Sequence, residues 1–200
     1  MKNNVFKFAV TLGLISAITG LALAVVFQIT NPIIAAQDAK ALERGLSEVF
    51  PGNYEFIKLD KPIQSSDQSV TINESFLVKD KASGKNIGMV VKVVVPGSQA
   101  PIKMLVGVKS DGTVSGVKIL KMNETAGLGS NADNPKYYVN KKDKITFLGQ
   151  FVNKNVIKDK LVPKEDIIAM TGATITSTAV SKGVKVAGEA IVSYLKEAGQ

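Results

Sequence analysis

The sequence predicts an α+β protein, with one apolar N-terminal helix that crosses a membrane and a single domain in which helices pack on a twisted antiparallel sheet. Three observations lead to this prediction. Residues 8–29 are an uncharged apolar run, two pairs of strand-like segments are each joined by a short glycine-containing turn, and an amphipathic helical pattern comes last. A length of 200 residues suits one domain plus an additional helix.

The apolar run is long enough to be a membrane anchor. Its 22 residues would form a helix of about 33 Å, which spans a hydrocarbon core of about 30 Å. Lys2 and Lys7 precede the run, and cationic residues favour the cytoplasmic side. We therefore expect a cytoplasmic segment 1–7, a transmembrane helix 8–29 in the cytoplasmic (inner) membrane, and an extracytoplasmic domain 30–200.

A cleaved signal peptide is the alternative to an anchor, because Ala22-Leu23-Ala24 resembles a cleavage site. The chain stays apolar through Val25, Val26 and Phe27, where a signal peptide would turn polar. This favours the uncleaved anchor. Asn31 and Pro32 follow the run, and we expect them to end the helix.

The domain begins with another helical pattern over residues 33–50, which Pro51-Gly52 ends. The apolar residues of the helical pattern recur at spacings of three and four, giving a stripe that can dock on a sheet. This stripe comprises Ala39, Leu42, Leu46, Val49 and Phe50. After this helix, residues 60–73 are polar and lack periodicity, so a surface loop is expected there.

Two hairpins are predicted next. The first joins residues 75–80 to residues 86–95, and the second joins residues 103–109 to residues 113–120. The second turn contains Asp111-Gly112, and Asp-Gly is the strongest short hairpin signal. Successive hairpins indicate an antiparallel sheet.

The last predicted element is a helix from about Ser177 to Leu195, with Thr176, Ser177 or Thr178 as its N-cap. Its apolar residues are separated by steps of three and four, so they lie on one helical face. They are Val180, Val184, Ala187, Ile191 and Leu195.

The residue types that the chain lacks exclude several kinds of catalytic and metal-binding site. It contains no Cys, no His and no Trp. The chain therefore has no thiolate nucleophile, no imidazole base or ligand, and no cysteine-ligated cluster. We expect neither a metal site nor catalytic acid–base residues. A reaction that these side chains cannot carry out would therefore require a bound cofactor.

The formal net charge is +8, from 25 basic and 17 acidic residues. Eight lysines lie between Lys136 and Lys164, with few aromatic residues among them. Recognition of stacked bases needs interleaved aromatic residues, so no nucleic-acid partner is expected. The pattern favours a solvated lysine-rich surface, and docking on an acidic partner or an anionic bilayer is the alternative.

The most informative segment is a hydroxyl-rich turn that leads into the last helix, with the sequence Thr-Gly-Ala-Thr-Ile-Thr-Ser at residues 171–177. Helix capping alone accounts for such hydroxyls. The same geometry favours an anion, because the free backbone N–H groups and the positive end of the helix dipole stabilise a phosphate near Thr174. Gly172 and Ala173 leave room for a close approach.

This segment resembles the flavinylation motif, Ser/Thr-Gly-Ala-Thr-x-Ser/Thr, of FMN-binding domains in the Rnf and Na⁺-translocating quinone-reductase complexes. The resemblance extends to the apolar anchor, to Pro101-Ile102 at the start of a strand, to Asn-Glu-Thr-Ala-Gly-Leu-Gly at residues 123–129, and to Phe-Leu-Gly-Gln-Phe at residues 147–151. Together these features resemble the G subunits of the Rnf ferredoxin–NAD⁺ oxidoreductase complexes.

The resemblance implies an electron-transfer subunit that works with other membrane subunits of an Rnf-type complex. A flavin transferase would move FMN from FAD onto Thr174 as a phosphoester. The implied cofactor-binding residues lie in two segments. They are Thr171, Gly172, Ala173, Thr174, Thr176 and Ser177 in the motif, and Glu124, Thr125, Gly127, Leu128 and Gly129 in the earlier loop.

The loop at residues 124–129 has two interpretations: it only turns the chain, or it folds over the flavin. In the second, Gly127 and Gly129 bring backbone N–H groups near the ring and Leu128 covers an apolar edge. Glu124 would then bond either loop backbone or the polar edge of the flavin.

The chain departs from the family pattern at two positions. Ala126 stands where the family often has a proline, which loosens the turn. Ile168 stands where the family commonly has an aspartate, and Asp166 lies two residues earlier. The second departure concerns how efficiently the transferase acts more than where it acts.

Other functions stay open at this point. The chain is compatible with the C subunit of a Na⁺-translocating quinone reductase or with an exported flavin carrier that feeds a separate reductase. It is also compatible with a non-redox membrane-anchored binding domain, in which the turn before the last helix is only a cap.

Overall fold

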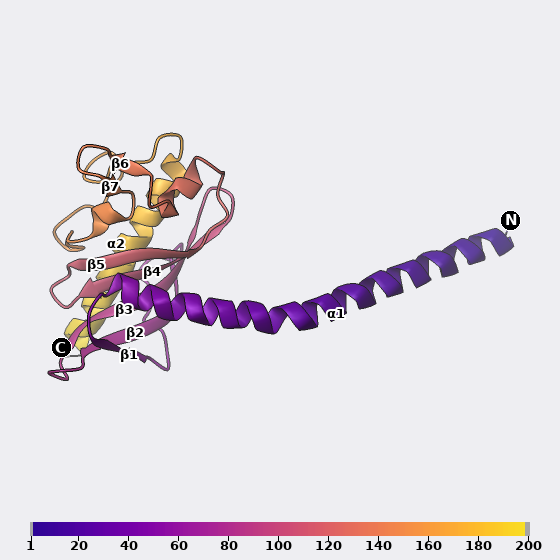
Figure 1. Cartoon of the computed structure of the whole chain (residues 1–200), viewed down its shortest axis with the longest axis horizontal. Coiled ribbons are helices and arrows are strands. Elements are labelled where there is room, and N and C mark those ends of the chain that lie inside the picture. Colours follow the sequence, from indigo (N-terminus) through magenta and orange to yellow (C-terminus); the bar gives the residue numbers. More distant parts are fainter. Residues whose placement is uncertain (1, 199–200) are drawn as a thin grey trace. The chain divides into compact units, whose positions relative to one another are not determined.

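The computed structural model describes residues 2–198, and Figure 1 shows the order of the elements along the chain. The chain divides into two compact units, Met1–Leu42 and Glu43–Gln200. The first unit is most of helix α1 (Lys2–Val49), and the second contains the end of that helix and all other elements.

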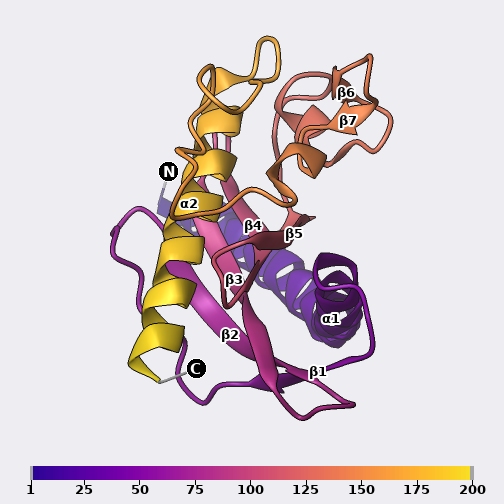
Figure 2. The ribbon, with the colours of Figure 1, turned by 90° about the vertical axis from the view of Figure 1, so that its left-hand side faces the viewer.

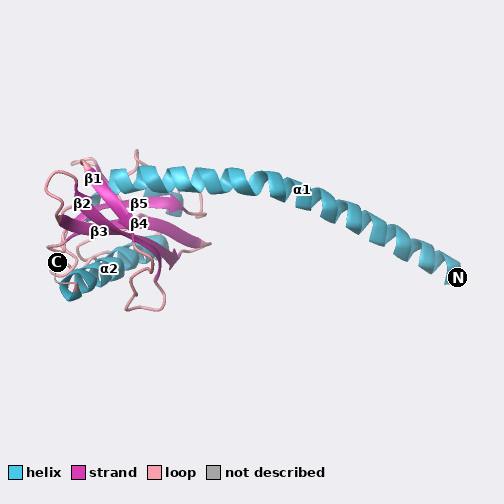
Figure 3. Ribbon diagram, turned by 90° about the horizontal axis from the view of Figure 1, so that it is seen from below, coloured by secondary structure: helices cyan, strands magenta, loops and turns pink. Residues whose placement is uncertain are grey.

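Helix α1 is uninterrupted at Pro32, so the prediction that Asn31 and Pro32 end the helix is wrong. A proline removes one backbone hydrogen bond, and long apolar helices tolerate this loss. Side chains from Asn4 to Lys40 are exposed, and the most apolar 18-residue window has a mean hydropathy of 2.3. Figure 3 shows α1 as one long helix. By length and composition, it can cross a membrane.

The second unit is built on a five-stranded antiparallel meander in which each strand pairs with the next. Both predicted hairpins are present, and their turns use glycines with positive φ, Gly84 (φ +67°) and Gly112 (φ +85°). The strands are β1 (Tyr54–Lys58), β2 (Thr71–Asp80), β3 (Asn86–Pro96), β4 (Pro101–Lys109) and β5 (Val114–Lys121).

The meander differs from the prediction in two ways. A short turn over residues 97–100 joins β3 to β4, so the two hairpins form one sheet. Strand β1 was not predicted, because five residues carry too short a pattern to identify a strand. It pairs with β2 and forms one edge of the sheet.

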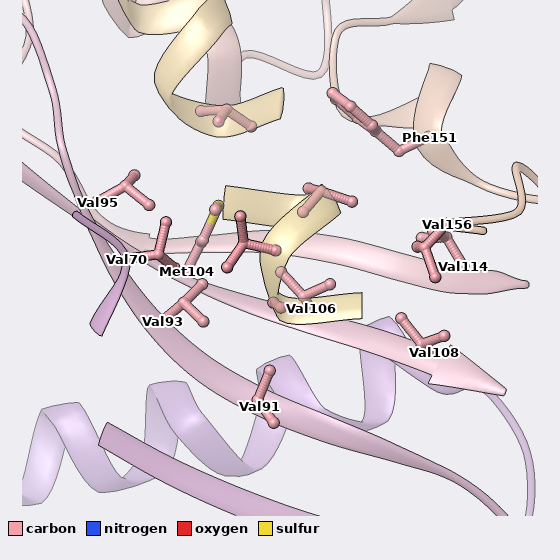
Figure 4. Packing of buried hydrophobic residues seen from close by; sticks show 14 of the residues in the cluster. Val70, Val91, Val93, Val95, Met104, Val106, Val108, Val114, Phe151 and Val156 are labelled. Atoms are coloured by element: carbon pink, nitrogen blue, oxygen red, sulfur yellow. The ribbon is translucent and has the colours of Figure 1, made fainter. Parts of the chain in front are cut away.

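One face of the sheet is covered by helix α2 (Thr174–Glu197), as Figure 2 shows. The predicted apolar stripe of this helix is confirmed, since all five of its residues are at most 1% exposed. Figure 4 shows alternate side chains of β3 and β4 within this core. Those labelled there are Val91, Val93, Val95, Met104, Val106 and Val108.

The opposite face of the sheet is covered by the last turns of α1. Leu46, Val49 and Phe50 are buried there, which confirms the end of the predicted stripe, whereas Ala39 is exposed. A Cβ atom on Gly116 would lie 2.6 Å from the backbone oxygen of Val49. The helix end therefore approaches the sheet so closely that only glycine fits beneath it.

Between β5 and α2 the chain forms a region of loops, residues 122–173, which includes a two-stranded sheet. Its core is an edge-to-face pair of buried rings, Phe147 and Phe151, with centroids 5.7 Å apart. The region's short elements are η1 (Gly129–Asp133), β6 (Tyr138–Asn140), β7 (Ile145–Thr146) and η2 (Gly149–Phe151).

Candidate functional site

Thr174 is the first residue of α2, and its side chain is exposed. The residue before it, Ala173, is the N-cap and makes no side-chain hydrogen bond to the helix. The first backbone N–H groups of a helix have no intrahelical acceptor, and they carry the positive end of the helix dipole. The hydroxyl of Thr174 therefore stands where a negative group is stabilised.

The turn before α2 brings the two predicted segments together. Gly172 has a φ of +73°, which L-residues rarely adopt, and a Cβ atom at this position would lie 2.9 Å from Leu128 Cδ2. Ala173 N–H donates to the Met170 carbonyl at 3.1 Å and closes the turn. The motif turn and the loop at residues 124–129 are thus in direct contact.

The predicted N-cap residues are not caps. The helix begins two residues before Thr176 and three before Ser177, so both lie inside its first turn and are buried. Ser177 Oγ donates to the Ala173 carbonyl at 2.9 Å and accepts from Met170 N–H at 3.0 Å. The prediction of an N-cap failed because Ser177 bonds backbone groups of the preceding turn and Thr176 Oγ1 donates to Glu124.

Glu124 joins three elements through both of its carboxylate oxygens. Its Oε1 accepts from the backbone N–H groups of Ser98 at 2.9 Å and Gln99 at 3.2 Å, in the β3–β4 turn. Its Oε2 accepts from Thr176 Oγ1 in α2 at 2.7 Å. Gly129 makes room for this arrangement, because a Cβ atom there would lie 2.7 Å from Glu124 Oε2.

A pocket of about 310 Å³ lies where these segments meet, and it is the more polar of two pockets beside Thr174. Eight predicted residues line it, together with Ser98 and Ile175, which were not predicted. The turn Pro96-Gly97 was the available signal for Ser98. The predicted residues in the lining are Glu124, Thr125, Leu128, Gly129, Gly172, Ala173, Thr174 and Thr176.

Three predicted residues lie outside this lining. Thr171 is exposed, and Ser177 is buried in the helix. Gly127 shapes the loop instead: it has a φ of +75°, and its N–H donates to Ser130 Oγ at 3.0 Å. Asn131 Nδ2 donates to the Gly127 carbonyl at 2.7 Å, which holds the other side of the same turn.

A second pocket, of about 380 Å³ and largely apolar, lies on the other side of Thr174. It shares Thr174 and Ile175 with the polar pocket, and its other lining includes Val70, Val95 and Pro96. At its rim Lys182 Nζ lies 2.8 Å from Asp67 Oδ2. The hydrogen bond from Lys182, together with those from Ser69, holds the pKa of Asp67 well below its usual range.

The segment that leads into the motif is held by side chains from elsewhere. Gln150 accepts from Ile168 N–H at 2.8 Å and donates to the Ile168 carbonyl at 3.1 Å. Asp166 accepts from the N–H groups of Leu161 and Val162 at 2.9 and 2.7 Å. Although partial burial opposes its ionisation, these N–H groups and nearby Lys154 hold the pKa of Asp166 below its ordinary value.

Comparison with known proteins shows the fold and the family of the chain. Residues 97–189 match the FMN-binding domain family, and residues 1–49 match the RnfG N-terminal region. The chain resembles the crystal structure of NqrC from Shewanella oneidensis, with a TM-score of 0.56 and 17% identity. The match covers 81% of this chain and 99% of that one, and at this identity it shows the fold.

Two relatives align with nearly the whole chain. The G subunit of the proton-translocating ferredoxin:NAD⁺ oxidoreductase complex of Clostridium ljungdahlii is 34% identical, covering 96% of this chain and 95% of that protein. The G subunit of the Na⁺-translocating complex of Acetobacterium woodii is 28% identical, covering 90% of this chain and 88% of that protein. The resemblance seen in the motifs is thereby confirmed, and the chain belongs to the family of G subunits of ion-translocating ferredoxin:NAD⁺ oxidoreductase (Rnf) complexes.

Proposed function

We propose that the chain is the electron-transfer subunit of an ion-translocating ferredoxin:NAD⁺ oxidoreductase complex in a membrane, and that FMN is attached to Thr174 through a phosphoester. Membership of the G-subunit family and the FMN-binding domain at residues 97–189 support the electron-transfer role. The other membrane subunits of such a complex are its partners. The position of Thr174 is the observation that supports the attachment site.

Thr174 differs from the other hydroxyl residues of the motif. Thr176 is buried and bonded to Glu124, and Ser177 is buried and bonded to backbone. Thr171 is exposed but lies outside both pockets. Among these four, only Thr174 combines an exposed side chain with a position at the start of α2 that lines both pockets.

The attachment needs an accessible hydroxyl and a site that tolerates negative charge. A flavin transferase outside the cytoplasm would join Thr174 Oγ1 to the phosphorus of the FMN half of FAD. The P–O–P bond of FAD breaks, AMP leaves, and the hydroxyl proton passes to a base of the transferase. The N–H groups at the start of α2 then face the charged phosphoester, which helix N-termini stabilise.

The surrounding residues fit a bound FMN. The flavin supplies one- and two-electron redox chemistry, so the chain itself needs no imidazole or thiol. Exposed Leu128 and Ile175 offer apolar surface beside the polar pocket, and Gly129 lines the same pocket without a side chain. Both oxygens of Glu124 already accept hydrogen bonds from the protein, which supports a role in holding the loop rather than in reaching the flavin.

The test of the attachment site is the intact mass of protein purified from its native host. The wild-type chain should carry the mass of FMN less one water, and Thr174→Ala should lose this addition and all covalent yellow fluorescence. The variant should stay folded, because the Thr174 side chain is exposed and makes no capping bond. Thr178→Ala removes an exposed hydroxyl one turn further along α2 and should keep its flavin. Flavin retained in Thr174→Ala would overturn the assignment.

We further propose that the N-terminus is cytoplasmic, that residues 8–29 are embedded in the cytoplasmic membrane, and that residues 30–200 lie outside. Lys2 and Lys7 before the apolar segment support this orientation. Protease added to intact spheroplasts should digest the domain of residues 43–200. A domain that is digested only after lysis contradicts the orientation, and a mature chain that begins near Val25 contradicts the anchor.

A further inference from the structure

The loops at residues 134–168 concentrate positive charge. They contain eight lysines and four carboxylate residues, so they hold half of the chain's formal charge of +8. Two of these lysines, Lys154 and Lys160, form ion pairs with Asp166 and Glu165. Six are exposed and form no ion pair with any described residue: Lys136, Lys141, Lys142, Lys144, Lys158 and Lys164.

Some of these lysines lie in turns that hydrogen bonds hold in place. In the β6–β7 turn, Asn140 Oδ1 accepts from Lys142 N–H at 3.1 Å and from Asp143 N–H at 3.2 Å, and Lys144 has a φ of +53°. Lys164 has a φ of +73° and donates its N–H to the Ile167 carbonyl at 2.8 Å. Left-handed conformations of non-glycine residues cost energy and are concentrated at functional sites.

Exposed apolar side chains accompany the lysines. Beyond helix α1, the large apolar residues that are exposed within the described part of the chain all fall between positions 128 and 175. They are Leu128, Val152, Ile157, Val162, Ile168 and Ile175. Leu128 and Ile175 line the polar pocket beside Thr174, whereas Val152 and Ile157 line other pockets, beside Glu48 and beside Glu189.

Part of this charge lies at one end of the domain. In Figures 1 and 2, β6 and β7, whose turn carries Lys141, Lys142 and Lys144, lie at the end where α2 begins, away from the C-terminus. Residues 154–159 lie further along α2, where Lys185 Nζ donates to the carbonyls of Val156 and Asp159. Thr174 is the first residue of that helix, and Gln150 fixes Ile168 six residues before it. A macromolecule bound to this lysine-rich end would therefore lie close to Thr174.

We propose that this lysine-rich end is a docking surface for an acidic electron-transfer protein, which it brings up to the flavin on Thr174. The proposal rests on the function proposed above. Transient redox complexes use small interfaces and opposite charges that speed encounter, and unpaired lysines with scattered apolar residues match that pattern. An anionic bilayer fits less well, because lipid contact over this end would cover the Thr174 hydroxyl that the transferase must reach.

The test uses the full-length flavinylated chain in phosphatidylcholine nanodiscs and two probes of equal size. One probe is cytochrome c made acidic by succinylation of its lysines, and the other is native, basic cytochrome c. Dithionite first reduces the flavin, after which each ferric haem takes one electron from it and becomes ferrous, and the flavin releases its protons to water. Stopped-flow absorbance measures the rate at low and high salt.

The acidic probe should react about tenfold faster at about 10 mM than at about 500 mM salt, because screening shortens the reach of the charges, and the basic probe should show no such gain. The triple variant Lys141→Gln, Lys142→Gln, Lys144→Gln should lower the low-salt rate about fivefold. A control with the same loss of charge, Lys61→Gln, Lys81→Gln, Lys85→Gln, removes exposed lysines elsewhere and should stay within about twofold of wild type. Equal slowing in both variants, or equal rates with both probes, overturns the proposal.

Two further measurements separate the causes of failure. Salt-dependent binding of the acidic probe, followed by sedimentation before any reduction, does not need the flavin. It therefore tests the surface even if Thr174 carries none. Lysine acetylation followed by mass spectrometry should label Lys141, Lys142 and Lys144 equally in phosphatidylcholine and phosphatidylglycerol nanodiscs. Protection only in phosphatidylglycerol would assign these loops to the bilayer and overturn docking on a protein.

Discussion

The sheet with its two covering helices is held mainly by apolar packing and its strand ladder, whereas the loops of residues 122–173 add to their apolar core hydrogen bonds between residues far apart in the sequence. In the sheet, alternate apolar residues of neighbouring strands pack against α2 on one face and against the end of α1 on the other. In the loops, single side chains bond backbone groups far away in the sequence. Glu124 reaches back to Ser98, and Gln150 reaches forward to Ile168.

Because of this difference, the scaffold packing mainly determines stability and the loop hydrogen bonds mainly determine the geometry of the site. Apolar packing is distributed over many residues, so the loss of one contact lowers stability without removing the rest of the scaffold, and substitutions that conserve volume are tolerated. A side chain that bonds two or three backbone groups has no such redundancy, and its loss leaves those groups unpaired. Changes to the scaffold should therefore lower stability, whereas changes to the loop contacts should alter the surroundings of Thr174.

The largest expected effect on stability comes from a substitution in the scaffold. Ile191 lies on α2 with no exposed surface, so Ile191→Ala should lower the free energy of unfolding by about 3 kcal/mol. The folded fraction should still carry flavin, because the pockets beside Thr174 do not include this residue. Ile175→Ala, the same substitution on the same helix, should cost less than about 1 kcal/mol because Ile175 is 64% exposed. Both losses are measured by urea denaturation. Equal losses of stability in the two variants would contradict the view that buried apolar packing stabilises the scaffold.

The scaffold was also the part that the sequence predicted well. Alternation and helical spacing identified β2, β3, β4, β5 and α2, because the same periodic burial that stabilises these elements marks their sequences. Errors occurred where one residue was taken to decide an element. Pro32 did not end α1, and the hydroxyls near the start of α2 were not caps. A single residue changes the local energy by a few kcal/mol at most, which the surrounding structure can offset.

The contacts of Glu124 should give the next largest effect. Glu124→Ala leaves two backbone N–H groups and Thr176 Oγ1 without their acceptor, which should cost about 2 kcal/mol and loosen the start of α2. Glu124→Gln can keep the same contacts, because its amide oxygen accepts from the N–H groups and its amide nitrogen donates to a rotated Thr176 hydroxyl. The glutamine variant should therefore retain most of the stability and all of the flavin attachment.

The Glu124→Gln variant also tests whether the loop covers the flavin. If it does, removing a nearby negative charge should raise the midpoint potential, since that charge disfavours the reduced flavin. Gly127→Val, which forces a branched side chain into a φ of +75°, should shift the flavin absorbance without preventing attachment. An unchanged spectrum and an unchanged potential in both variants would mean that the loop only turns the chain.

Sequence alone located the two segments of the site but not the bonds between them. Glu124 and Thr176 are 52 residues apart, and no local pattern shows that one accepts a hydrogen bond from the other. Ser98 was missed for the same reason, because it enters the pocket through the β3–β4 turn that Glu124 holds. The assignment of Thr174 as the attachment site came from the motif, and its exposure and helix position now support that assignment.

The smallest expected effect belongs to Asp166, whose carboxylate accepts from two backbone N–H groups in the turn before the motif. Its pKa in the folded chain is below the ordinary value, so its contribution to stability is complete above the unfolded pKa and is lost as the pH falls through the folded pKa. Asp166→Asn should therefore cost about 1 kcal/mol at pH 7, and its difference from wild type should shrink below about pH 4. Asp60→Asn, which changes an exposed carboxylate in the β1–β2 loop, should change stability by less than about 0.5 kcal/mol at every pH. Urea denaturation between about pH 3 and pH 7 measures both variants. A difference in the free energy of unfolding between Asp166→Asn and the wild type that stays constant over this pH range would show that the turn depends on the shape of the side chain and not on its charge.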